Sequence, residues 1–329
     1  MTEFAARPQQ SAGITNLQAL ILTDGKMGDL AQCRGIADHL GAQTTEITVR
    51  PSKLAAFTGK LGRDRDFDGM IASTSNIPSL VLSSGRRTVP YIKALKKRWG
   101  SATLTVFLKD PRTGANTADL IWVPTHDKLR GANVITTDTA PHGWTQPKRA
   151  KQGSNLRAQL SRFPRPWLGV VLGGVTKRVD YGPATIEALT QAAANAAQGA
   201  GSVIITPSRR TPDALKVALS SIHRHTWVWD GTRDNPYPGM LGACDAFLVT
   251  GDSHNMVSEV LSAGRHTMVF RPDGLPKKFH RFLDGIEASG HTQPTGLAQF
   301  NRTQASLDAT PEIASAIKRA LERAQALDT

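Results

Sequence analysis

The stretch AFLVTGDSHNMVSE at residues 246–259 decides the fold that the sequence predicts. An apolar run ends in a loop of small polar residues, and a helix follows. A continuous apolar run closed by a glycine-containing turn is typical of a parallel strand buried on both faces. Glu259 is suited to accept hydrogen bonds from both hydroxyls of a ribose, and Ser253 and Asn255 to donate toward phosphates or a sugar. The alternative interpretation is that Asp252, Ser253 and Glu259 only cap the helix.

The same order of strand, polar turn and helix recurs along both halves of the chain. Apolar runs typical of strands stand at residues 17–23, 44–49, 80–83, 103–108, 120–123, 167–172, 202–206, 226–229, 246–250 and 267–270. Strand and helix signals that alternate at this spacing indicate βαβ units and a parallel sheet. The predicted fold class is therefore α/β, with two Rossmann-like domains that face a cleft.

The domain limits follow from a change of character between residues 147 and 166, where basic residues replace large apolar ones. This stretch predicts a linker that is helical in part, over residues 155–162. A rough apolar stripe near the C-terminus predicts a last helix that packs back across the domain boundary. The expected parts are a disordered lead-in at 1–16, a first domain at 17–150, a second domain at 165–305 and the C-terminal helix at 306–329.

The chain of 329 residues is strongly basic, with 40 Lys and Arg against 27 Asp and Glu and a formal charge of +13. This excess favours an anionic partner, namely a nucleotide diphosphate, a nucleic acid or an acidic membrane surface. A generally basic surface without a specific partner is the plain alternative. Aromatic residues make up only 6% of the chain, and the sequence has no RNA-recognition signature or zinc-finger spacing, so we expect no nucleic acid partner.

The sequence predicts a cytoplasmic protein. Cys33 and Cys244 stand one in each half, which gives no disulfide framework. The N-terminal residues are polar, and no uncharged apolar run reaches the roughly 18 residues that suggest a spanning helix. Peripheral contact of basic residues with an anionic surface at the inner membrane stays open.

Four further polar turns follow predicted strands and suit anions. They contain Asp24, Gly25, Lys26 and Gly28; Arg86 and Arg87; Gly173 and Gly174; and Ser208, Arg209 and Arg210. Glycines leave room for a phosphate against backbone N–H donors, and guanidinium groups bind phosphate through two parallel hydrogen bonds. Each turn also has a plain interpretation as a tight or solvated turn, or, for Ser208 and Thr211, as a helix N-cap.

The sequence lacks the common cofactor and metal motifs. It has neither G-x-x-x-x-G-K-[ST] nor G-x-G-x-x-G, and no Tyr-x-x-x-Lys pair, which argues against an NAD-dependent sugar epimerase. Asp64-Arg65-Asp66 and Asp66-Phe67-Asp68 match D-x-D, but they stand in a charged turn that we interpret as solvated loop. We therefore expect no metal site. His126 and His142 follow predicted strands and are candidate general bases.

Together these segments resemble the mitochondrial fission Elm-type family, from about residue 18 to residue 295. The resemblance is carried by TDGKMGDLAQ (23–32), SSGRRTVP (83–90), KDPR (109–112), VPTHD (123–127), APH (140–142), LGG (172–174), TPSRRTP (206–212), DNPYPGML (234–241) and VTGDSHNMVSEVLSAG (249–264). The chain departs from the family pattern at Lys109, where Gln is commoner, and at His254, where Val or Ser is expected.

The resemblance implies two different functions. Bacterial members are described as candidate glycosyltransferases of the glycosyltransferase-B type, whereas plant members are similar to adaptors that recruit a dynamin-related protein to mitochondria. Segment 249–264 also looks like the donor-binding segment of glycosyltransferase-B enzymes such as the lipid-linked muramoyl-peptide GlcNAc transferase. In that segment the glutamate that matches Glu259 binds ribose. An adaptor has no need for clustered Gly/Arg turns, so we favour the enzyme.

We therefore expect transfer of a sugar, with inversion or retention, from a nucleotide-diphosphate sugar to an acceptor such as a cell-envelope glycan or lipid, with no obligatory cofactor. The second domain would bind the nucleotide sugar and the first the acceptor. The expected nucleotide-sugar contacts are Gly173, Gly174, Ser208, Arg209, Arg210, Asp252, Ser253, Asn255 and Glu259. The expected catalytic residues are Asp24, Lys26 and His126, and the expected acceptor or phosphate contacts are Gly25, Gly28, Arg86 and Arg87. Backbone donors near Gly173, with Arg209 or Arg210, are expected to stabilise the leaving diphosphate.

Overall fold

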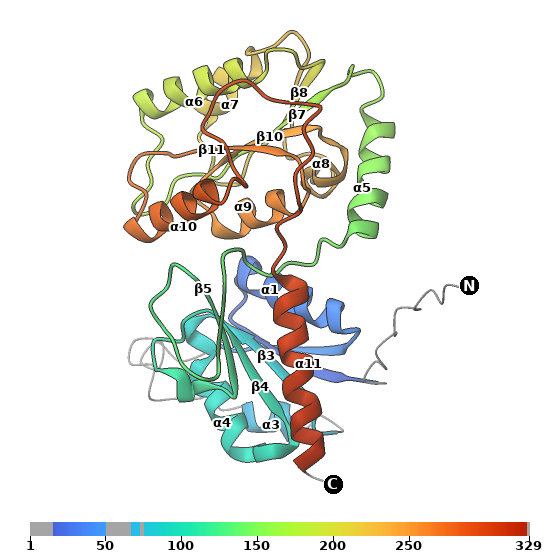
Figure 1. Cartoon of the computed structure of the whole chain (residues 1–329), viewed down its shortest axis with the longest axis vertical. Coiled ribbons are helices and arrows are strands. Elements are labelled where there is room, and N and C mark those ends of the chain that lie inside the picture. The colour runs from blue at the N-terminus through green and yellow to red at the C-terminus, as the bar shows by residue number, and fades with distance from the viewer. Residues whose placement is uncertain (1–15, 51–66, 73–75, 328–329) are drawn as a thin grey trace, which may run out of the picture.

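The computed structural model describes residues 16–50, 67–72 and 76–327. Within these residues the chain forms two parallel sheets with helices around them, one above the other in Figure 1. The D-x-D matches that include Asp64 and Asp66 fall outside the described residues, as do the first 15 residues of the expected lead-in.

The first sheet has six parallel strands in the order β2-β1-β3-β4-β5-β6. The strands are β1 (Gln18–Thr23), β2 (Gln43–Thr48), β3 (Leu80–Ser84), β4 (Leu104–Leu108), β5 (Leu120–Pro124) and β6 (Val134–Thr137). The central strands β3 and β4 are buried along their whole length, as strands covered on both faces must be. The sequence did not predict β6, because its four residues VITT are mostly half-buried and carry little apolar signal.

Helices cover both faces of the first sheet. They are α1 (Met27–Leu40), α3 (Phe67–Ala72) and α4 (Val89–Trp99), with short 3-10 turns at Arg86–Thr88, Gly100–Ala102 and Ala115–Thr117. Successive residues of a strand point to opposite faces. Accordingly Ala19 and Ile21 of β1 join the core that contains α1, whereas Leu20 and Leu22 join the core that contains α4.

The second sheet has five parallel strands in the order β11-β10-β7-β8-β9. The strands are β7 (Trp167–Val171), β8 (Ser202–Thr206), β9 (Thr226–Val228), β10 (Ala246–Thr250) and β11 (His266–Phe270). Its helices are α6 (Pro183–Ala196), α7 (Asp213–Ser220), α8 (Tyr237–Ala243), α9 (His254–Leu261) and α10 (Lys277–Ala288). Every residue of β7, β8 and β10 is buried, which explains why these apolar runs were recognised from sequence.

The chain crosses between the two sheets twice. After β6 it runs through residues 138–145 into helix α5 (Gln146–Gln159), which begins earlier than the predicted 155 and packs against α8. Pro147 in the first turn suits a helix start, because its missing N–H is not needed there. The second crossing leads into α11 (Thr310–Leu327), whose Ile313 and Ile317 are buried in the first domain against α1 (Figure 1).

Helices α5 and α8 touch backbone to backbone through a pair of glycines. A Cβ atom at Gly153 would lie 2.5 Å from the carbonyl carbon of Gly242, and one at Gly242 would lie 1.9 Å from the carbonyl oxygen of Arg149. Neither distance is compatible with a side chain. The glycines therefore set how closely the helix that follows the first crossing approaches the second domain.

We predict that Gly153→Ala lowers the free energy of unfolding by about 1–3 kcal/mol, because the added methyl group forces the two helices apart. The matched control is Gly285→Ala in α10, where no atom lies within 4 Å of the added Cβ. That change should raise stability by about 0.5–1 kcal/mol through helix propensity. Urea unfolding of both variants measures the difference, and equal effects would contradict the close contact.

Candidate functional site

Three polar turns meet at the carboxyl edge of the second sheet, because they follow the adjacent strands β10, β7 and β8. The N–H of Gly173 donates to the hydroxyl of Thr250 at 2.7 Å, and the N–H of Gly174 donates to the carboxylate of Asp252 at 3.0 Å. The hydroxyl of Ser208 donates to the carbonyl of Gly173 at 2.8 Å. The structure thus brings together four of the residues expected to bind the nucleotide sugar.

The paired glycines serve the packing of these turns. A Cβ atom at Gly173 would lie 2.0 Å from the carboxylate of Asp252, and one at Gly174 would lie 2.3 Å from the backbone of Arg210. We expected the N–H groups near Gly173 to face a leaving diphosphate. In this structure both N–H groups instead donate within the protein, to Thr250 and Asp252. Donors for a diphosphate must therefore come from elsewhere.

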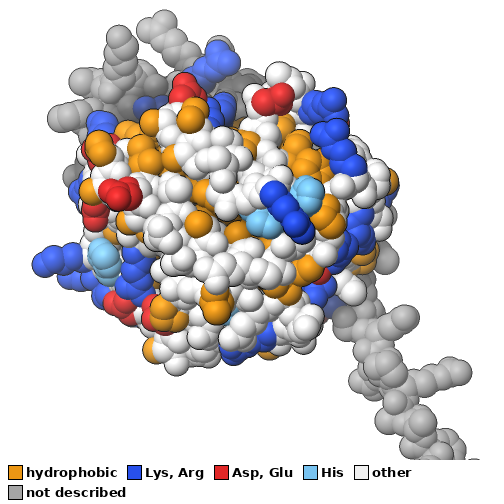
Figure 2. Space-filling model, turned by 90° about the horizontal axis from the view of Figure 1, so that it is seen from above, with side chains coloured by type: hydrophobic (Ala, Val, Ile, Leu, Met, Phe, Trp, Pro, Cys, Tyr) orange, Lys and Arg blue, Asp and Glu red, His pale blue; other side chains and the backbone are white. Residues whose placement is uncertain are grey.

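Arginine side chains beside this cluster are free to meet an anion. Arg209 and Arg210 are exposed, and neither guanidinium forms an ion pair or hydrogen bond with another residue that the structure describes. Arg86 and Arg87, after β3 of the first sheet, are exposed in the same way. Figure 2 shows Lys and Arg side chains spread over the face seen from above, most of them near its outline.

The N-terminus of α9 joins the two domains. The side chain of Asn255 donates to the carbonyl of Gly28 at 3.0 Å and accepts from the amide of Gln32 at 2.9 Å, both at the start of α1. Asn255 therefore contacts the first domain, a role that no local signal in the sequence could reveal. Ser253 caps α9 by accepting from the N–H of Met256 at 3.3 Å, in agreement with the capping interpretation of that residue.

Two carboxylates of the first domain lie close together, one directly after β1 and one in the first turn of α1. Asp24 pairs with Lys26 at 2.7 Å and exposes only 1% of its side chain. Asp29 pairs with Lys109, which follows β4 and has a φ of 104°, a region that L residues seldom adopt. A Cβ atom added at Gly85 would lie within 3.4 Å of both carboxylates. Asp29 and Lys109 were not predicted as site residues, although both belong to the segments that carry the family resemblance.

A pocket of about 670 Å³ opens between the domains around His126. From the first domain its lining includes Asp127, Lys128 and Arg130, and from α10 it includes Arg281 and Phe282. Arg130 fixes the loop by donating to the carbonyls of Thr125, Asp127 and Leu129. Arg281 donates to the carbonyl of His126 at 3.1 Å and so ties the two walls together.

The imidazole of His126 in this pocket is held neutral. Burial lowers its pKa to about 4. The ring lies 5.0 Å from that of His254 and 5.6 Å from that of Phe282, measured between centroids. Burial also lowers the pKa of His254 to about 3, and its Nε2 contacts the carbonyl of Asp138 at 2.9 Å. His142, the other candidate base, is instead buried at the first crossing.

Glu259 is half-buried on α9 and already has two neutral donors. The hydroxyl of Tyr237 donates to its Oε2 at 2.6 Å, and the indole of Trp144 donates to the same carboxyl group. Burial raises the pKa of Glu259 to about 7, and the two hydrogen bonds oppose that rise. Tyr237 stands in the sequence segment that carries the family resemblance, but nothing in the pattern pointed to its contact with Glu259.

Two further observations concern the described residues alone. They contain no group of three or more His, Cys, Asp or Glu arranged to hold a metal ion. None of their helices is long and apolar enough to cross a membrane.

Two Rossmann-like domains that face a cleft, with polar turns at the carboxyl edges of both sheets, define a protein of the glycosyltransferase-B fold class. Within that class the chain belongs to the family described as mitochondrial fission ELM1, whose model matches residues 27–321. The sequence resemblance to this family is thereby confirmed.

The comparisons with individual proteins agree with this assignment. The chain is 26% identical over 273 residues to the mitochondrial fission protein ELM1 of Arabidopsis thaliana, covering 74% of this chain and 64% of that protein. A UDP-glucosyltransferase from Polygonum tinctorium has a similar structure, with a TM-score of 0.52, 12% identity and coverage of 94% and 92% of the two chains. The UDP-GlcNAc 2-epimerase of Methanocaldococcus jannaschii also has a similar structure, with a TM-score of 0.51 and 9% identity. The match covers 94% of this chain and 99% of the epimerase chain. At such identities the structural likeness establishes the predicted fold.

We predict that Glu259→Gln raises the melting temperature more at pH 8 than at pH 5. The folded-state pKa of Glu259, about 7, lies above its ordinary value of 4.5, so the folded protein retains a proton that the unfolded chain releases between these pH values. The penalty for burying the charge is therefore fully present above pH 7 and fades as the pH falls toward 4.5. Glu187→Gln, at an exposed position of α6, is the control and should show no such pH dependence in thermal melts.

Proposed function

We propose that this protein is a glycosyltransferase that moves a sugar from a nucleotide-diphosphate sugar to an acceptor bound in the interdomain cleft. The observation that carries the proposal is the environment of Glu259, which lies on the helix that follows β10. Two neutral donors, Tyr237 and Trp144, orient its carboxylate. The carboxyl edge of a parallel sheet is where α/β folds bind ligands. In this position the carboxylate is suited to accept hydrogen bonds from the two hydroxyls of a ribose.

The diphosphate would lie between the N-terminus of α9 and the exposed Arg209 and Arg210. A helix N-terminus presents free N–H groups and the positive end of the helix dipole. These donors take the place of the glycine N–H groups that are committed within the turns. When the bond from the sugar to the diphosphate breaks, negative charge grows on the leaving group, and arginine stabilises it without a metal ion.

The acceptor would enter the pocket around His126. Its hydroxyl oxygen forms the new bond to the anomeric carbon, and its proton passes to the neutral imidazole. A pKa of about 4 keeps this imidazole unprotonated, and so able to accept a hydrogen bond, throughout the neutral range. Asp24 and Lys26 would take part in catalysis with His126, and Gly25, Gly28, Arg86 and Arg87 would contact the acceptor or a phosphate.

The names of similar proteins support a nucleotide sugar and suggest uridine as the first base to test. Both solved structures compared above are named for UDP-sugar chemistry, one a transferase and the other an epimerase. The Arabidopsis relative favours the alternative function, a non-catalytic adaptor. This chain spans 64% of that relative, so a shared partner is itself a proposal. A cytoplasmic location and contact with an anionic membrane surface also stay predictions.

We predict that Glu259→Gln weakens binding of uridine diphosphate by roughly ten- to hundredfold, because a charge-assisted pair of hydrogen bonds of about 1.5–3 kcal/mol is lost. Arg209→Ala should weaken binding of the diphosphate more than binding of the bare nucleoside. Calorimetry with uridine, guanosine and cytidine diphosphates measures both effects. The adaptor hypothesis expects no nucleotide to bind at millimolar concentration and neither variant to matter.

We predict further that His126→Ala slows release of uridine diphosphate from a UDP-sugar by about a hundredfold or more while nucleotide affinity stays unchanged. His223→Ala, at the turn before β9, is the matched control and should leave the rate as it is. A coupled assay for the released diphosphate gives the rate, and calorimetry gives the affinity. An equal loss in both histidine variants would remove His126 from the proposed mechanism.

A further inference from the structure

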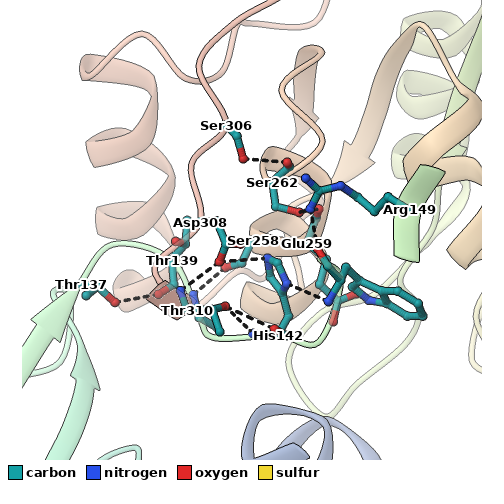
Figure 3. A network of polar contacts seen from close by, with 12 residues as sticks. Thr137, Thr139, His142, Arg149, Ser258, Glu259, Ser262, Ser306, Asp308 and Thr310 are labelled. Atoms are coloured by element: carbon teal, nitrogen blue, oxygen red, sulfur yellow. Dashed lines mark hydrogen bonds and ion pairs between the residues drawn. The ribbon is translucent and has the colours of Figure 1, made fainter. Parts of the chain in front are cut away.

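The carboxylate of Glu259 lies where three separate parts of the chain meet. Tyr237 opens α8 and donates its hydroxyl to Oε2 at 2.6 Å, and Trp144 donates from the first crossing between the domains. Figure 3 shows Glu259 on α9 beside the network of polar contacts that surrounds both crossings. The two donors therefore reach one carboxyl group from two separate segments, both of which precede Glu259 in the sequence.

The backbone that carries Trp144 is itself fixed by polar contacts to α9. Arg149 donates through Nη1 to the carbonyl of Trp144 at 2.5 Å and to the hydroxyl of Ser262 at 3.0 Å. The N–H of Ala140 donates to the hydroxyl of Ser258 at 2.9 Å. Ser258 precedes Glu259 on α9 and Ser262 directly follows the helix, so the crossing is attached before and after Glu259 (Figure 3).

The two donors leave lone pairs of the Glu259 carboxylate unused. An ionised carboxylate has about four lone-pair sites, and Tyr237 and Trp144 use two of them. The two that remain match the number of hydroxyls in a ribose diol. Glu259 as a whole residue is half-buried.

We propose that Tyr237 and Trp144 are positioning residues that hold the Glu259 carboxylate toward the ribose hydroxyls of the nucleotide. This inference rests on the proposed function and names residues through which Glu259 acts. Neither side chain contacts the nucleotide. Tyr237 fixes the carboxylate from within the second domain, and Trp144 ties its orientation to the segment that joins the domains.

The hydrogen bonds also favour the charged form of Glu259, which is the form that accepts two hydroxyl donors. Burial raises the pKa of this group to about 7, and the bonds from Tyr237 and Trp144 work against the rise. The other charged or titratable groups around α9 here are Arg149 on α5 and the pair His142 and Asp308 on the two crossings. Removing the phenol hydroxyl should therefore move the titration of Glu259 to higher pH.

The experiment is calorimetry of uridine diphosphate binding from pH 5.5 to 8.5 with the full-length protein and its Tyr237→Phe variant. Wild-type affinity should rise with pH through about 7, as Glu259 loses its proton. In Tyr237→Phe the midpoint should move upward, and affinity at pH 7 should fall by about tenfold, the effect of one hydrogen bond to a charged group. Tyr91→Phe removes a phenol hydroxyl in the first domain and should change neither quantity.

Trp144→Phe provides an independent variant and should shift the midpoint in the same direction. A wild-type protein that binds the diphosphate and depends on Glu259, with Tyr237→Phe and Trp144→Phe both folded and unchanged in midpoint, would overturn this inference and leave the proposed function standing. A wild-type protein that binds no nucleoside diphosphate at millimolar concentration would overturn both. Circular dichroism of each variant confirms that a loss of affinity is measured on folded protein.

Discussion

The position of helix α9 between the domains is the constraint on which the arrangement of this molecule depends. Its N-terminus meets the first domain through Asn255, which bonds to Gly28 and Gln32 across more than 220 residues of sequence. Its flank meets the first crossing through Ser258. Because the same eight-residue helix also carries Glu259, the position of the candidate ribose contact and the orientation of the domains are set by one element.

Polar groups contribute to the contacts of α9 with the first domain and the crossings, and this has energetic consequences. A buried donor or acceptor left without a partner costs about 1–3 kcal/mol, so a crossing built from such groups is stable only in the arrangement that satisfies them together. The hydroxyl of Thr310 accepts from the N–H of His142, and the hydroxyl of Ser306 donates to the carbonyl of Ser262. A change in the angle between the domains would have to break several of these bonds at once.

The sequence predicted the strands that depend on apolar burial and missed helices whose local signal is weak. β7, β8 and β10 are continuous apolar runs because both faces are covered, and this signal is visible locally. Helices α8 and α10 were not predicted. α8 is only seven residues long and rich in glycine and proline, whereas the twelve residues of α10 contain several charged side chains.

In the candidate site, too, the sequence located polar residues but not the residues that they contact. The turn that contains Gly173 and Gly174 was located from sequence. Paired glycines suit both a phosphate and a tightly packed loop, and the close approach of Asp252 and Arg210 becomes visible only in the fold. Asn255 and Glu259 were recognised as polar residues at a strand end. Their partners could not be recognised, because Gln32 and Trp144 lie on segments that only the fold brings to α9.

The nature of the donors around Glu259 bears on the proposed role of this residue in binding. An arginine or lysine in place of Tyr237 and Trp144 would hold the carboxylate more firmly and lower its pKa, and it would also occupy the lone pairs and neutralise the charge that a ribose diol needs. Two neutral donors orient the group and leave its charge uncompensated. Burial then raises the pKa of Glu259 to about 7, although the two hydrogen bonds oppose the rise. A buried carboxylate without a cationic partner is poorly arranged for stability, and its remaining lone pairs can accept further hydrogen bonds.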